Sequence, residues 1–270
     1  MPNRVAPSIL AADFLHLDKE IEMLNSYADI IHLDVMDGSF VPNISFGFSV
    51  LEPVSKIARI PMDAHLMIVH PEKYIERIAG LGIQMISVHL EAIRDQGDDP
   101  SEMLGYIRSL GCQAGLAFNP DVPVEECYPY LKDCDYVLAM SVRAGFGGQN
   151  IDPNIYSRVR TLKAEIARQG LETPVQIDGG VTILNAPELA DAGVDIFVAG
   201  STVFKATDPA SVIAFLRAAG RVPLQEYNSA LYAGTLKQDW EDPQGNRSGS
   251  HPGRFLLCSY LYWPRPGCSL

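Results

Sequence analysis

The side chains best suited to chemistry begin with an imidazole and a carboxylate two residues apart, His32 and Asp34, inside the apolar run 30–36. Successive side chains of a strand point to opposite faces, so His32, Asp34 and Met36 share one face and the other face is wholly apolar. An apolar outer face indicates that helices cover the sheet. The inner face must then surround something polar, because an imidazole and a carboxylate are costly to bury without partners.

Two further runs supply matching groups. In the run 62–67 the same alternation puts Asp63 and His65 on one face, and the run 175–178 ends at Asp178, just before two glycines. A single strand histidine is more often an ordinary core residue, but four such groups at one level of a barrel are hard to explain as core. Two imidazoles and two carboxylates suit one divalent ion, Zn²⁺, Fe²⁺, Mn²⁺ or Co²⁺, among which the sequence does not choose. The predicted metal ligands are His32, Asp34, His65 and Asp178.

Three glycine-rich turns follow the last three strand-like runs. Glycine lets backbone N–H groups approach an anion closely, and the loops after strands seven and eight are the usual phosphate site of a β/α barrel. These turns predict a phosphorylated ligand that needs no Lys or Arg, because oriented amides suffice. The turns are Gly145-Phe146-Gly147-Gly148-Gln149, Asp178-Gly179-Gly180 and Ala199-Gly200-Ser201.

The elements that must position these groups are eight short apolar runs that alternate with helical patterns, which is typical of a parallel sheet. Eight βα units fit a (β/α)8 TIM barrel, a parallel eight-stranded fold whose active sites lie where the strands end. An open, doubly wound sheet is the alternative. The predicted strands are 5–10, 30–36, 62–67, 85–90, 114–118, 136–142, 175–178 and 196–199.

Apolar residues three and four positions apart predict the helices between the strands. In the first helix these are Phe14, Leu17, Ile21 and Leu24, and in the sixth they are Val159, Leu162 and Ile166. Prolines that suit a first helical turn are Pro71, Pro123 and Pro209, and glycines that suit a helix end are Gly82, Gly111, Gly170 and Gly193.

Composition restricts the partners and the compartment. The chain has 270 residues with a net charge of −12, which argues against a nucleic-acid footprint of clustered Lys and Arg. No apolar stretch is long enough to cross a bilayer, and the N-terminus lacks the features of a signal peptide, so we expect a cytoplasmic protein with no membrane partner. The five cysteines contain no CxxC spacing and are expected to be reduced and structural.

The composition changes after the last predicted helix. Residues 1–221 are expected to form the TIM-barrel domain, and residues 222–270 a C-terminal extension that is poorly ordered or loosely docked. Both tryptophans and a run rich in Gly, Ser and Pro fall in this extension.

With these features in place, the chain resembles the ribulose-phosphate 3-epimerases. The matching stretches lie in order between residues 6 and 204 and are APSILAADF, HLDVMDGSFVPNISFG, DAHLMI, VHLEA, GLAFNP, MSVRAGFGGQ, QIDGGV and VAGSTVF. The resemblance implies a metal-dependent, reversible 3-epimerisation of D-ribulose 5-phosphate to D-xylulose 5-phosphate by two carboxylates through an enediolate. It implies a small sugar phosphate as substrate, and we expect a homo-oligomer.

Residue by residue, the resemblance implies that Asp34 is the proton acceptor and Asp178 the proton donor, and that both are metal ligands with His32 and His65. It places Ser8, His65 and the turns at the substrate: Gly145, Phe146, Gly147, Gly148, Asp178, Gly179 and Gly180, with Gly200 and Ser201 at the phosphate. From strand parity, Met36, Met67 and Met140 are expected to wall the pocket, or equally to fill the barrel.

Other polar residues are given structural roles. We expect His89 to be hydrogen bonded in the interior and Asp37 to organise the turn with Gly38, and we expect His16 and His70 to take no part in catalysis.

One departure from the family falls at the substrate loop. Where the family commonly has an acidic residue or Asn followed by Pro, the chain has Arg143-Ala144, which loses a fixed φ and adds a cation. The alternatives that stay open are a 3-epimerase of a hexulose 6-phosphate and a non-catalytic sugar-phosphate sensor.

Overall fold

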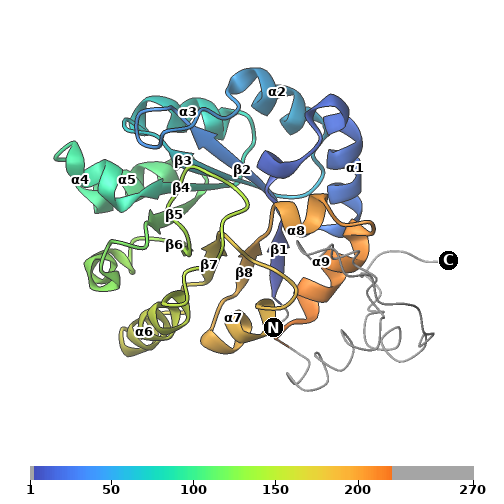
Figure 1. Ribbon diagram of the computed structural model, residues 1–270. Helices are drawn as coiled ribbons and strands as arrows, with labels where there is room; N and C mark the ends of the chain where they lie inside the picture. The colour runs from blue at the N-terminus through green and yellow to red at the C-terminus, as the bar shows by residue number, and fades with distance from the viewer. Residues whose placement is uncertain (1–2, 221–270) are drawn as a thin grey trace, which may run out of the picture.

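The computed structural model describes residues 3–220, and eight parallel strands form a nearly closed barrel with helices on its outside (Figure 1). The strands are β1 (Arg4–Ala6), β2 (Ile31–Met36), β3 (Met62–Met67), β4 (Met85–His89), β5 (Gln113–Phe118), β6 (Tyr136–Met140), β7 (Val175–Asp178) and β8 (Ile196–Val198). They pair in the order β1-β8-β7-β6-β5-β4-β3-β2. The remaining gap is spanned by a parallel bridge between Ser8 and His32. The predicted (β/α)8 fold is therefore confirmed.

The outer layer consists of helices between successive strands. The α-helices are α1 (Leu17–Tyr27), α2 (Phe48–Ile57), α3 (Glu72–Gly80), α4 (Leu90–Asp95), α5 (Pro100–Ser109), α6 (Ile155–Arg168), α7 (Ala186–Ala192), α8 (Ser201–Phe204) and α9 (Pro209–Ala218). Short 3₁₀ helices are η1 (Ile9–Ala11), η2 (Phe14–His16) and η3 (Val124–Tyr130). The glycines predicted to end helices, Gly82, Gly111, Gly170 and Gly193, all have positive φ, the conformation that favours glycine after a last helical turn.

Alternation along β2 separates two cores. Leu33 and Val35 point outward into the apolar layer between sheet and helices, whereas Met36 belongs to a smaller cluster inside the barrel. Burying a leucine such as Leu33, which has no exposed surface, stabilises the fold by about 2 kcal/mol. The register pairs His32 with Asp63 and Asp34 with His65 across β2 and β3, so the polar groups of the two strands are neighbours.

A tyrosine fills the lower part of the barrel because a glycine makes room for it. A Cβ on Gly115 would lie 2.3 Å from the Tyr136 ring, so no other residue fits there without displacement. The fully buried Tyr136 then reaches across the barrel and donates a 2.7 Å hydrogen bond to Asp63 Oδ1.

The first predicted strand and helix were wrong in their bounds. The strand ends at Ala6 rather than residue 10, because Ser8 Oγ accepts a hydrogen bond from the backbone N of Leu10 and begins η1. The first α-helix begins at Leu17, and Phe14 lies in η2 with 47% of its surface exposed. The sixth predicted strand ends at Met140, two residues early, because Ser141 turns its hydroxyl to the carbonyls of Asp178 and Gly179.

Residues near the N-terminal and C-terminal ends of the described chain contact each other. The side chain of Asn3 donates to the carbonyl of Val194 and accepts from the backbone N of Gly220. The Arg217 guanidinium of α9 lies 3.0 Å from Asp29 Oδ2. The predicted extension, residues 222–270, lies outside the described residues.

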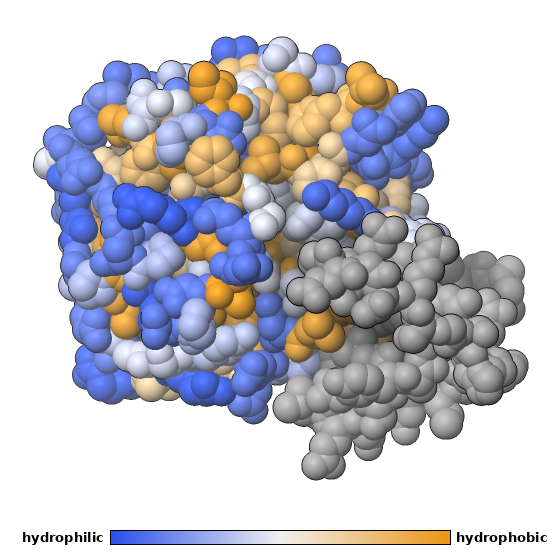
Figure 2. All heavy atoms as spheres, in the orientation of Figure 1, coloured by the Kyte–Doolittle hydropathy of each residue, from blue (hydrophilic) through white to orange (hydrophobic). Residues whose placement is uncertain are grey.

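The surface, the cysteines and the helix lengths can be compared with the sequence predictions within residues 3–220. Figure 2 shows hydrophilic residues over much of this face, with apolar surface gathered toward the side where α1 and α2 lie. Cys112, Cys127 and Cys134 are buried and unpaired, and Cys258 and Cys268 lie outside the described residues. Within residues 3–220 every helix is too short or too polar to cross a bilayer.

Candidate metal centre and active-site cleft

Four side chains from three strands converge at the carboxyl end of the barrel. They are His32, Asp34, His65 and Asp178, and one donor atom of each lies within 4.8 Å of all the others. His65 Nδ1 lies 3.2 Å from Asp34 Oδ1 and 3.5 Å from Asp178 Oδ2, and His32 Nε2 lies 3.3 Å from Asp34 Oδ1. Ligands at about 2.1 Å around a tetrahedral ion are roughly 3.4 Å apart. The spacing therefore fits one divalent metal ion, and the sequence-predicted set is brought together.

A buried atom without a partner also points to a cation. His32 Nδ1 lies 2.8 Å from Asp63 Oδ2, which fixes the ring, while its Nε2 faces the cluster with no hydrogen-bond partner. Asp63 is held in turn by Tyr136 and by Gln176 Nε2 at 2.7 Å. A buried polar atom left unsatisfied is costly, and a metal ion would remove that cost. The sequence placed Asp63 on the inner face but did not identify it as the partner of His32.

Electrostatics in the cluster favour the ionised carboxylates. Burial disfavours the His32 imidazolium, but the carboxylates of Asp34 and Asp63 outweigh it and hold the pKa of His32 well above its usual value. Burial likewise opposes ionisation of Asp34, and the neighbouring imidazoles of His32 and His65 nevertheless lower its pKa. A divalent cation that displaced the imidazole protons would leave two carboxylates and two neutral imidazoles around it, and its charge would balance that of the carboxylates.

The two oxygens of Asp34 face different groups. Oδ1 faces the imidazoles of His32 and His65, and Oδ2 accepts a hydrogen bond from Ser8 Oγ. Asp34 and Asp178 both line the cleft above the cluster, and 16% of the Asp178 side chain is exposed. Each carboxylate can therefore reach both the cluster and a bound molecule.

The cleft has a volume of about 790 Å³ and is lined by most of the predicted substrate residues. These are Ser8, Gly145, Phe146, Gly147, Gly148, Asp178, Gly179, Gly180, Gly200 and Ser201, with Met36, Met67 and Met140 along the wall. His32 and His65 do not line the cleft; both are fully buried beneath it. The resemblance implied that His65 contacts the substrate directly, but His65 has no exposed surface in this structure.

Glycine is required at the turn after β7. Gly179 and Gly180 have φ of +106° and +61°. A Cβ on Gly179 would lie 2.4 Å from Val142 Cγ2, and one on Gly180 would lie 2.6 Å from the backbone N of Ile151. Side chains at these positions would displace the loop that follows β6.

A cation that the sequence analysis missed lies in the cleft. Among the described residues, Lys205 is the only lysine or arginine that lines it, directly after α8 and beside Ser201 and Thr202. Its signal in the sequence was its spacing of four residues from Ser201, which follows the Gly200 turn. The sequence analysis predicted that the phosphate turns need no Lys or Arg, and it did not identify Lys205 as a residue of the same cleft.

Three side chains from two other loops, the loop after β2 and the loop after β5, hold the loop after β6. Arg143 pairs with Asp121 at 2.8 Å, and Asn43 Nδ2 donates to the carbonyl of Gly145 at 2.8 Å. The backbone N of Ala144 donates to Asn119 Oδ1 at 2.9 Å, a hydrogen bond that a proline could not make. The departure at Arg143-Ala144 thus replaces a fixed φ with two contacts to the loop after β5.

Two structural predictions are confirmed. Asp37 Oδ1 accepts from the backbone N of Ser39 and Phe40, and its Oδ2 accepts from Val69. His89 is fully buried and lies 2.9 Å from His65 through their Nε2 atoms.

The two histidines expected to take no part in catalysis lie outside the cluster. His16 pairs with Asp13 at 2.7 Å, and His70 lies 3.3 Å from Glu72.

A (β/α)8 barrel with buried imidazoles and carboxylates below a glycine-lined cleft defines a TIM-barrel enzyme. The chain belongs to the ribulose-phosphate 3 epimerase family, whose model matches residues 4–204. It is 42% identical over 213 residues to ribulose-phosphate 3-epimerase of Mycobacterium tuberculosis (strain ATCC 25618 / H37Rv), covering 79% of this chain and 91% of that protein. With the enzyme of that name from Synechocystis sp. it shares 42% identity over 214 residues, 79% and 92% of the two chains. It is thus an epimerase of a family that acts on sugar phosphates.

More distant solved structures share the fold. KGPDC from Streptococcus mutans superposes with a TM-score of 0.61 at 12% identity, covering 82% of this chain and 98% of that one. Orotidine 5'-phosphate decarboxylase from Pyrococcus horikoshii superposes with a TM-score of 0.56 at 13% identity, covering 81% and 100%. At this level of identity the similarity concerns the barrel alone.

Proposed function

We propose that the chain catalyses the metal-dependent, reversible 3-epimerisation of D-ribulose 5-phosphate to D-xylulose 5-phosphate. The observation that carries the proposal is the placement of two carboxylates, Asp34 and Asp178, each turned to the imidazole pair with one oxygen and lining the cleft. The names of the relatives support the choice of substrate.

His32, Asp34, His65 and Asp178 would hold the divalent ion, which the donor set restricts to Zn²⁺, Fe²⁺, Mn²⁺ or Co²⁺. When bound, such an ion polarises the substrate ketone and stabilises negative charge beside it. Asp63 keeps the His32 ring turned so that Nε2 faces the cluster.

The two acids exchange one proton each with the substrate. Asp34, whose low pKa keeps it ionised, takes the proton from C3 and leaves an enediolate. Asp178 donates a proton to the opposite face of C3, which inverts that centre. In the reverse direction the roles exchange, so both carboxylates act as acid and as base.

The rest of the cleft would bind the phosphate and shield the enediolate from water. The turns at Gly180 and Gly200, with Ser201, would place amide and hydroxyl groups around the phosphate, and Lys205 would supply a positive charge. The methionines Met36, Met67 and Met140 would keep water from the enediolate with uncharged, polarizable surface.

The proposal also covers the bounds of the catalytic domain, the cellular location and the oligomeric state. Residues 1–221 would form the catalytic barrel, in agreement with the contacts between Asn3 and Gly220 that join its ends. The cytoplasmic location, the homo-oligomer and the lack of a nucleic-acid partner stay predictions.

The test adds ribulose 5-phosphate in D₂O to metal-loaded protein and follows the products by NMR. Formation of xylulose 5-phosphate with deuterium at C3 is expected, because a proton held by a carboxylate exchanges with solvent before it returns. Conversion without any deuterium at C3, or no conversion at all, would contradict the proposal. A hexulose 6-phosphate in a parallel sample measures whether the pentulose is preferred.

A further inference from the structure

The imidazole of His65 has a partner on the side that faces away from the carboxylates. Its Nδ1 faces Asp34 and Asp178, while its Nε2 lies 2.9 Å from Nε2 of His89, the last residue of β4. Both rings are fully buried, with centroids 5.0 Å apart. His89 is not one of the four clustered donors, so any effect it has on them passes through His65.

The direction of this hydrogen bond follows from the chemistry of the ring. If Nδ1 of His65 offers its lone pair to a metal ion, the neutral ring carries its proton on Nε2. That N–H then donates to His89 Nε2, which must accept with a lone pair. The proton of His89 therefore lies on Nδ1.

Glu91 supplies the acceptor that His89 requires. His89 Nδ1 lies 3.5 Å from Glu91 Oε2, and within residues 3–220 neither of these two buried atoms has a hydrogen-bond partner. Burial opposes ionisation of Glu91, but the contact with His89 and the backbone N–H of Asn119 outweigh it and lower its pKa to about 2. The carboxylate is therefore charged at neutral pH.

The second oxygen of this carboxylate leads to the loop over the cleft. Glu91 Oε1 accepts from the backbone N of Asn119 at 2.9 Å. Asn119 Oδ1 accepts from the backbone N of Ala144, also at 2.9 Å. Ala144 is buried and directly precedes Gly145, which lines the cleft.

We propose that His89 and Glu91 are positioning residues that fix the tautomer of His65 for metal binding, and that Glu91 ties this site through Asn119 to the loop over the cleft. The inference rests on the proposed metal site. An acceptor that holds the free N–H of a ligating imidazole orients the ring and makes its other nitrogen a better donor. Here His89 is that acceptor for His65, and Glu91 orients His89. Glu91 thus contacts both His89, behind the metal centre, and Asn119, which holds the loop that lines the cleft.

The variant test replaces Glu91 with glutamine, which has one carbonyl oxygen and cannot accept from both His89 and Asn119. The metal dissociation constant of Glu91→Gln, measured by competition with a chelator, is expected to rise about 10- to 100-fold. Hydrogen exchange at the Ala144 amide is expected to accelerate. The matched control is Glu165→Gln, a glutamate of α6 whose pKa is also lowered to about 2, by Arg168. It should change neither quantity.

Wild-type affinity and wild-type exchange in Glu91→Gln would overturn the inference. If the wild-type protein does not bind metal, both the inference and the proposed function are overturned. If the wild type shows metal-dependent turnover and Glu91→Gln keeps wild-type affinity and exchange, only the inference is overturned.

If Glu91→Gln does not fold, nitrogen-15 NMR of the zinc-loaded wild type decides. Protons on His65 Nε2 and His89 Nδ1 support the inference, and a proton on His89 Nε2 overturns it.

Discussion

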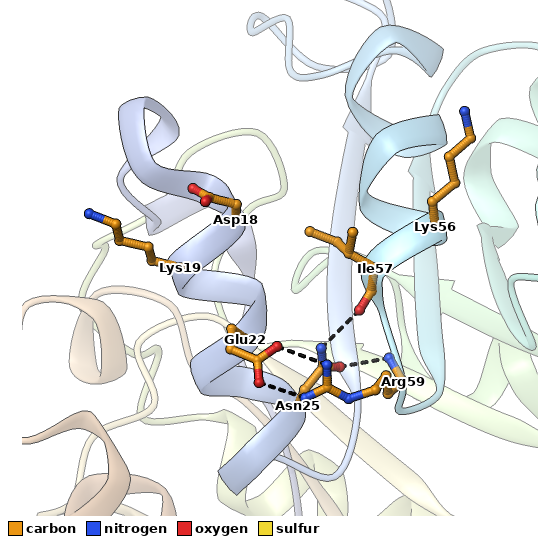
Figure 3. A pocket seen from close by; sticks show the side chains of 7 residues that line it. All are labelled: Asp18, Lys19, Glu22, Asn25, Lys56, Ile57 and Arg59. Atoms are coloured by element: carbon orange, nitrogen blue, oxygen red, sulfur yellow. Dashed lines mark hydrogen bonds and ion pairs between the residues drawn. The ribbon is translucent and has the colours of Figure 1, made fainter.

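Two hollows on this barrel contain carboxylates beside cationic or titratable groups, and they differ in what those groups contact. The cleft of about 790 Å³ has Asp34 and Asp178 above buried imidazoles. A groove of about 600 Å³ between α1 and α2 is lined by Asp18, Lys19, Glu22, Asn25, Lys56, Ile57 and Arg59 (Figure 3).

In the groove Glu22, Asn25 and Arg59 pair with one another or with nearby backbone, and the other charged side chains are exposed. Arg59 forms a two-fold hydrogen bond with Glu22 at 2.6 and 2.8 Å, and both side chains are about 60% exposed. Asn25 joins the helices by bonds to the carbonyl of Ile57 and the backbone N of Arg59 (Figure 3). Beneath the cleft, by contrast, His32 Nε2 is buried without a hydrogen-bond partner among residues 3–220. Buried polar groups that lack hydrogen-bond partners, more than charge alone, therefore mark a reactive site.

The largest expected effect separates the acids of the two hollows. Asp34→Asn and Asp178→Asn should each lower kcat by about 10²- to 10⁴-fold, because an amide cannot transfer the proton. Asp18→Asn in the groove should keep wild-type turnover. Steady-state rates with ribulose 5-phosphate measure all three, and near wild-type turnover in either cleft variant would remove the two-acid mechanism.

Removal of the metal tests whether the four clustered side chains bind an ion that stabilises the fold. A chelator should lower the unfolding midpoint, because an ion that binds only the folded state stabilises it by about 2.7 kcal/mol at 100 times its Kd. Calorimetry with and without added Zn²⁺ or Mn²⁺ measures the shift. Arg59→Ala, which alters only the groove, should show the same shift on chelation as the wild type, and a missing shift in the wild type would argue against the metal centre.

The next effect concerns the carboxylate behind His32. Asp63→Asn should weaken metal binding about 10- to 100-fold, because the amide no longer offers two acceptor oxygens to His32, Gln176 and Tyr136. Chelator competition measures the affinity. Glu22→Gln removes a carboxylate of the groove and should leave it unchanged. Equal affinities in the two variants would mean that Asp63 does not orient His32.

The smallest effect distinguishes the lysines of the two hollows. Lys205→Met should raise KM several-fold with little change in kcat, since a charged hydrogen bond contributes about 1.5–3 kcal/mol and exposure weakens it. Added salt should narrow the difference between Lys205→Met and wild type. Lys56→Met should have the wild-type KM. An unchanged KM in Lys205→Met would place the phosphate away from this side chain.

Local periodicity was enough to predict much of the site. The two-residue alternation of a strand placed His32 with Asp34 and Asp63 with His65 on inner faces, and the structure agrees because β2 and β3 pair residue for residue. The turn role of Asp37 was also predictable, since a carboxylate before Gly38 can accept from nearby backbone N–H groups.

Contacts between groups on different strands and loops could not be predicted from local patterns. The Ser8 contact with Asp34, the His65 contact with His89 and the position of Lys205 in the cleft all depend on where a strand stops and how the next element turns. Sequence periodicity carries no information on such distances, because each contact joins segments that are far apart in the chain and is fixed by barrel closure and register. Residue types and their periodicity therefore predict the barrel and the kinds of donor, whereas strand register and barrel closure set which donor atoms are left to bind a metal ion.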